Sequence, residues 1–89
     1  MSRVEATRSE VQRLLRAAPF RPFALILENG DRVVIGHPEN IAFDPVLTED
    51  EKGWDEFYAI SGKLRWFSTF HAVTSVALLD RADVDQQVK

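Results

Sequence analysis

The sequence predicts an α+β domain made mostly of strands, in which an N-terminal helix precedes a small, strongly bent antiparallel sheet or barrel of five or six strands. Three observations support this prediction. Apolar residues repeat at helical spacing near the N-terminus, two apolar runs flank an Asn-Gly pair within residues 22–36, and further short apolar runs follow as far as residue 79. We assign residues 1–80 to one helix-plus-barrel domain. Residues 81–89, rich in charged and amide side chains, are expected to form a flexible tail.

The helix is predicted from an apolar stripe over residues 11–18, at i, i+3, i+4 and i+7. Two capping-box patterns compete for its start, one beginning at Ser2 and one at Thr7. We favour Thr7, because the stripe is continuous only after it. Pro19 is expected to end the helix, since proline removes a backbone donor and restricts the residue before it.

The first hairpin is the strongest local prediction. Asn29-Gly30 between apolar runs favours a two-residue type I′ turn, in which both residues take positive φ. That turn places Ile26 opposite Val33. One face of the hairpin then carries Ala24, Ile26, Val33 and Ile35, and the other carries Phe23, Leu25, Leu27 and Val34. Both faces are apolar, so both must be covered by other parts of the protein.

The remaining strands are shorter and less regular. A third strand is predicted over residues 40–43, a second hairpin over 57–60 and 64–67, and a last strand over 73–79. Residues 44–56 form an acidic loop with a net charge of −5, whereas residues 3–21 carry +3. This difference in charge has two interpretations. Either the basic region of one copy of the chain attracts the acidic region of another, or both regions are simply surfaces exposed to solvent.

The composition limits the classes of protein to which this chain can belong. The 89 residues include no cysteine, and the net charge is −3. No apolar run approaches the roughly 20 residues that a membrane span needs, and the charged N-terminal stretch does not fit a secretory leader. We therefore expect a cytoplasmic protein that does not interact with membranes.

Catalysis finds little support in the sequence. No serine lies in a nucleophile-elbow pattern, and two histidines offer few general bases. His37, Glu39 and His71 are the residues to weigh as metal ligands, since two histidines and a carboxylate can form a facial triad. Pro38 makes the local geometry a turn, and no short-range ligand pair is present. We predict no enzyme activity, no metal and no cofactor.

Three short patterns resemble a group of small uncharacterised bacterial proteins. They are the Phe-Arg-Pro-Phe of residues 20–23, the Asn-Gly-Asp-Arg of residues 29–32 and the His-Pro-Glu of residues 37–39. This resemblance implies no known activity.

A second resemblance is to the bacterial Sm-like (Hfq-type) family, in which a short helix leads into a five-stranded barrel that closes into a ring. Residues 22–30 are similar to the first strand and Asn-Gly turn of that family, Phe43-Asp44 to the end of its second strand, and residues 71–74 to its His-Ala-Ile-Ser. The lysine that precedes the His-Ala step in the family is Phe70 here. The resemblance implies a ring that binds RNA.

The function that we predict is a non-enzymatic interaction or assembly module, acting through homo-oligomerisation or a protein partner. Trp66 and Phe67 alternate sides of one strand, so one fills the core and the other faces outward. The interface candidates are Trp66, Phe67, Tyr58, Arg13 and Arg16.

The alternative is an Sm-like RNA-binding protein. Its candidate residues are His71, Lys63 and Arg65, which lie among aromatic residues suited to stacking on bases. The acidic net charge disfavours this alternative, because nucleic-acid-binding domains usually carry a basic surface.

Overall fold

The computed structural model describes residues 3–43 and 55–80. Its elements, in order, are α1 (Arg3–Arg16), β1 (Phe23–Leu27), β2 (Arg32–Ile35), η1 (Pro38–Asn40), β3 (Ile41–Ala42), β4 (Glu56–Ser61), β5 (Leu64–Thr69), η2 (Phe70–Ala72) and β6 (Val73–Leu78). The predicted α+β class, with one N-terminal helix and mostly strands, is confirmed. The predicted tail at 81–89 and most of the acidic loop lie outside the described residues.

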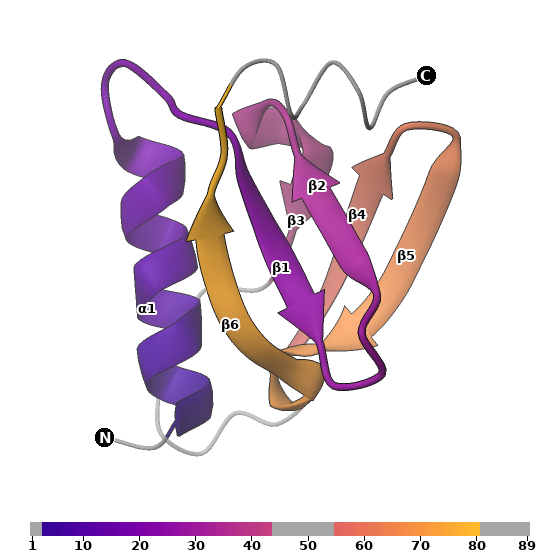
Figure 1. Ribbon diagram of the computed structural model, residues 1–89. Coiled ribbons are helices and arrows are strands. Elements are labelled where there is room, and N and C mark those ends of the chain that lie inside the picture. The colour runs from indigo at the N-terminus through magenta and orange to yellow at the C-terminus, as the bar shows by residue number, and fades with distance from the viewer. Residues whose placement is uncertain (1–2, 44–54, 81–89) are drawn as a thin grey trace.

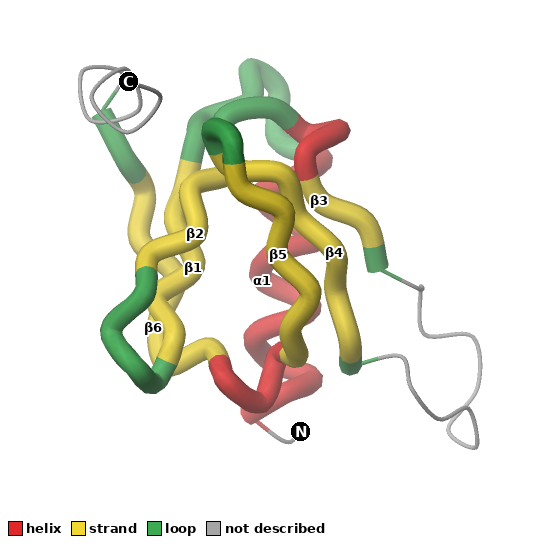
Figure 2. The backbone as a smooth tube through the Cα atoms, turned by 90° about the vertical axis from the view of Figure 1, so that its right-hand side faces the viewer, coloured by secondary structure: helices red, strands yellow, loops and turns green. Residues whose placement is uncertain are grey.

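The strands form two antiparallel sheets of three strands each, and the described strands do not close into a barrel. Sheet A has the order β2-β1-β6, and sheet B has the order β3-β4-β5 (Figure 1). In Figure 2, α1 lies behind the strands and between the two sheets, on the side away from β5. The backbone N–H of Val34 in β2 donates to Oγ of Ser61 in β4 at 3.1 Å, which joins the sheets through a side chain where a barrel would use a strand ladder.

The helix starts earlier than predicted. It is already helical at Arg3 and ends at Arg16, so the preference for a start at Thr7 is wrong. Val4 and Arg8 are both buried and extend the apolar stripe by two turns toward the N-terminus. The long aliphatic stem of an arginine can pack like an apolar residue, which a count of apolar letters does not detect.

The Asn29-Gly30 hairpin forms, but with a different turn. Gly30 has a φ of +91°, and no non-glycine residue of the described part has positive φ, so the type I′ prediction is wrong. The loop has three residues, because the N–H of Leu27 donates to the carbonyl of Asp31 at 2.8 Å. Oδ1 of Asn29 accepts the N–H of Asp31 at 2.9 Å, an arrangement that holds Asn29 in the turn without positive φ.

The extra loop residue changes the register of the hairpin by one. Leu25 pairs with Val33 and Ala24 with Val34, so the predicted assignment of β2 residues to faces is wrong. A one-residue shift moves every side chain of a strand to the other face. The face turned to the main core carries Phe23, Leu25, Leu27, Val33 and Ile35, and the other carries a small buried cluster of Ala24, Val34 and Leu79.

Replacing Gly30 by alanine is expected to destabilise the protein by about 1 kcal/mol, because an L-residue is strained at positive φ. A Cβ atom at this position would meet no atom within 4 Å, so steric contact adds nothing to the cost. Urea unfolding of the two proteins at 25 °C measures the difference. An unchanged midpoint would show that the turn does not depend on the left-handed conformation.

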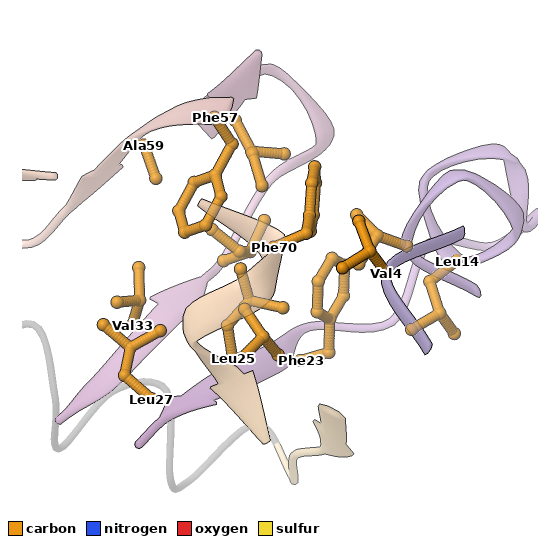
Figure 3. Close-up of a cluster of buried hydrophobic side chains, with 13 residues drawn as sticks. Val4, Leu14, Phe23, Leu25, Leu27, Val33, Phe57, Ala59 and Phe70 are labelled. Carbon is orange, nitrogen blue, oxygen red and sulfur yellow. The ribbon is translucent and has the colours of Figure 1, made fainter. Parts of the chain in front are cut away.

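The main core lies between the two sheets and α1. Figure 3 shows Val4 and Leu14 of α1 beside Phe23, with Phe57 and Phe70 on the side of sheet B. Phe70 contacts two other rings at an angle, with centroids 5.1 Å from both Phe43 and Phe57. The helix therefore packs against the inner layer of the fold and leaves the outer face of sheet B uncovered by any described element.

None of the helices in the described residues has the length and apolar character to cross a membrane.

Candidate interaction surface

Sheet B has one face that points away from the core. By the register of β3, β4 and β5, this outer face carries Ala42, Glu56, Tyr58, Ile60, Arg65, Phe67 and Thr69. Tyr58 is 40 % exposed, Ile60 38 % and Phe67 71 %. Three large apolar side chains thus share one small solvent-facing surface, and such clusters on a protein surface mark contact sites.

The predicted alternation of Trp66 and Phe67 is present in β5. Trp66 pairs with the buried Ala59 and packs against the core, whereas Phe67 pairs with Tyr58 on the outer face. The outward-facing aromatic is therefore Phe67. Trp66 was named as an interface candidate, and the structure places it on the inner side of sheet B, apart from Phe67 and Tyr58.

A shallow depression of about 360 Å³ opens on the outer face of sheet B. Its lining residues are Ala42, Phe43, Glu56, Phe57, Tyr58 and Phe67. Aromatic rings with one carboxylate make up most of this surface. A cationic group fits that chemistry, since the face of an aromatic ring and a carboxylate both attract positive charge.

Arg65 is itself a residue of the outer face, near the β4–β5 turn. Its Nη1 donates to the hydroxyl oxygen of Tyr58 at 3.3 Å, and this hydrogen bond raises the pKa of the guanidinium. Arg65 lies opposite Ile60, on the far side of the Tyr58–Phe67 pair from Glu56. It is not among the residues that line the depression.

The candidates on the helix lie on a separate surface. Arg13 and Arg16 occupy the last turn of α1 and are exposed. Arg13 donates to both carboxylate oxygens of Glu10 at 2.8 and 2.6 Å, and this hydrogen bonding lowers the pKa of Glu10. Arg16 forms no hydrogen bond or ion pair with another described residue, so its guanidinium is available to contact another molecule.

A second polar cluster fastens the start of α1 to η2. Nη2 of Arg3 donates to the carbonyl of His71 at 2.9 Å, and Nε2 of His71 lies 3.4 Å from Oδ2 of Asp55. Arg8 is 3 % exposed, and burial lowers the pKa of its guanidinium against the opposing effect of Glu5 and Asp55. These contacts hold secondary structure elements together and so have a structural role.

The RNA-binding candidates are spread over the molecule. Lys63 lies in the β4–β5 turn, Arg65 near that end of β5, and His71 in η2 beyond the other end. The six residues of β5 span roughly 20 Å at about 3.3 Å per residue, so Lys63 and His71 are not brought together. RNA binding through these residues stays a prediction.

The residues considered above as metal ligands also lie on separate elements. His37 precedes η1 and Glu39 lies within it, while His71 lies in η2 and pairs with Asp55. In the part of the chain that the structure describes, no group of three histidine or carboxylate side chains has the arrangement of a metal site.

Sequence reasoning missed several residues of the outer face and its depression, among them Ala42, Phe43, Glu56, Ile60 and Thr69. The signal for Glu56 and Ile60 was present. A two-residue turn at Gly62-Lys63 puts Tyr58 opposite Phe67, and residues two positions away then share their face. No such signal pointed to Ala42 or Phe43, because the acidic loop separates them in the sequence from β4, the strand that they contact.

Comparisons of the chain with protein-family models, curated proteins and solved structures give no match.

Proposed function

We propose that this protein is a non-enzymatic assembly module that associates with further copies of itself through the outer face of sheet B. The observation that carries the proposal is the exposure of Phe67, which is 71 % accessible, whereas Trp66, the other aromatic residue of β5, packs against the core. A rigid aromatic side chain with few rotamers is a strong interface anchor, because it loses little conformational entropy when it is buried.

The position of Phe67 supports the same proposal. It lies on β5, which is an outer strand of sheet B among the described residues. Edge strands offer unpaired backbone groups as well as side chains to an incoming chain. Tyr58 and Ile60 on β4 enlarge the apolar area behind Phe67, so a partner copy could bury a continuous surface rather than one ring.

Light scattering on a sizing column tests the proposal with wild type, Phe67→Ser and Leu78→Ser. Leu78 is 48 % exposed but lies in β6 of sheet A, so its variant removes a comparable apolar side chain from another surface. We expect wild type to form an assembly of more than one chain at about 100 µM, a concentration at which contacts of micromolar Kd are saturated. Phe67→Ser should elute with the mass of one chain, and Leu78→Ser should match wild type.

Two outcomes would contradict the proposal. One is a wild-type protein that has the mass of a single chain under these conditions. The other is an equal loss of mass in both variants, because a general effect of removing surface apolar residues would then explain the result. Far-UV circular dichroism of each variant shows whether the fold is kept.

A further inference from the structure

The side chains that line the depression on the outer face of sheet B indicate which chemical group binds there. Phe43, Tyr58 and Phe67 supply ring surfaces, and Glu56 supplies a carboxylate. Glu56 is exposed on β4 and forms no ion pair with any other residue in the described ranges 3–43 and 55–80. A purely apolar partner would leave this carboxylate beside the contact without a counter-ion, which is costly as water is excluded. A cationic side chain satisfies both the rings and the carboxylate.

The chain carries a cation suited to this depression on a different surface. Arg16 is exposed in the last turn of α1 and has no partner within the described part of the chain, whereas Arg13 in the same turn is held by Glu10. Arginine is favoured over lysine for such a contact, because its planar guanidinium stacks on aromatic rings and binds a carboxylate through two hydrogen bonds. The positive charge of α1 and the negative charge of Glu56 are complementary between copies.

We infer that the depression lined by Phe43, Tyr58, Phe67 and Glu56 binds the guanidinium of Arg16 from a second copy of this chain. The inference rests on the proposed function, since it names the partner group of the same face. Arg16 and the depression lie on separate elements, α1 and sheet B, and Figure 1 shows α1 and β5 on opposite sides of the fold. A contact between two different patches is head-to-tail, and it generates a ring or a filament according to the angle between copies.

Two charge-reversal variants test the inference when they are studied alone and then mixed. Glu56→Arg and Arg16→Glu each place like charges at the contact, so each alone should associate at least tenfold more weakly than wild type. In an equimolar mixture, the altered face of Glu56→Arg meets the altered helix of Arg16→Glu, and the remaining contacts are those of wild type. The mixture should therefore associate at least tenfold more strongly than either variant alone.

Glu39→Arg is the matched control. Glu39 is an exposed carboxylate in η1 that does not line the depression, and the change in net charge equals that of Glu56→Arg. It should associate like wild type. Because Glu56 and Arg16 are exposed, all three variants should keep the wild-type circular dichroism spectrum.

The outcomes separate the inference from the proposed function. Charge variants that retain the wild-type mass, or a mixture that associates no more strongly than either variant alone, would overturn the inference. If Phe67→Ser dissociates the assembly while both charge variants remain assembled, the outer face is still the interface and only its Arg16 partner is wrong. If wild type is a single chain, both proposals fail.

Discussion

Replacing Phe70 by alanine is expected to lower the free energy of unfolding by about 3–5 kcal/mol, the range measured for large aromatic residues in protein cores. Phe70 is fully buried, and its ring lies 5.1 Å from those of both Phe43 and Phe57. Domains of this kind have a total stability of about 5–15 kcal/mol, so the loss is a large fraction of the whole. Urea unfolding at 25 °C, followed by circular dichroism, measures it.

Phe67→Ala is the control for this substitution, because it deletes the same atoms from an exposed position. Below the concentration at which the protein associates, Phe67→Ala should change the unfolding free energy by no more than about 0.5 kcal/mol. Equal effects of the two substitutions would contradict the assignment of Phe70 to the core and Phe67 to the surface.

Trp66→Ala is expected to lower the free energy of unfolding by about 3 kcal/mol, while Trp66→Phe should lower it by about 1 kcal/mol or less. The indole of Trp66 packs against the core beside Ala59, and its Nε1 is buried without a hydrogen-bond acceptor among the described residues. Phenylalanine keeps most of the packing and removes a donor that is unsatisfied in the fold. Thermal and urea unfolding of the two variants measure the contrast.

The same two variants separate a core role from an interface role for Trp66. Because Trp66 faces inward, Trp66→Phe should form assemblies of wild-type mass. A Trp66→Phe variant that keeps wild-type stability but elutes as a single chain would show that Trp66 contacts a partner after all.

The element order could be predicted from the sequence because each signal is local. The apolar stripe of α1, the Asn29-Gly30 turn and the hairpin around Gly62 depend on residues close together in the chain. The turn type was harder. Asn-Gly fits both a two-residue type I′ turn and a three-residue loop with glycine at its last position, and the side chain of Asn29 stabilises the second.

The arrangement of the sheets could not be predicted, since it depends on contacts between distant segments. A closed barrel and two sheets have the same pattern of short apolar strands. The difference lies in whether β2 forms a ladder with sheet B or only the Val34–Ser61 hydrogen bond. Nothing in either strand specifies that choice.

The candidate surface was predicted in part. Alternation in β5 showed that Trp66 and Phe67 lie on opposite sides, but both faces of the β4–β5 hairpin contain large apolar residues. The alternation of side chains along β5 therefore could not show which of the two aromatic residues faces the core. The burial of Phe57 and Ala59, fixed by their contact with Phe70 and the other sheet, decides that Trp66 is inside.

The pairing of β1 with β6 has a consequence for how the chain folds as it is synthesised. Phe23 of β1 pairs with Leu78 of β6, so sheet A joins segments made at nearly opposite ends of the described chain. An isolated β1–β2 hairpin is marginally stable in water. Until β6 has left the ribosome, the edge of β1 that faces away from β2 has no strand to pair with. Native structure in sheet A must therefore wait for β6, which makes its formation late and slow relative to the helix.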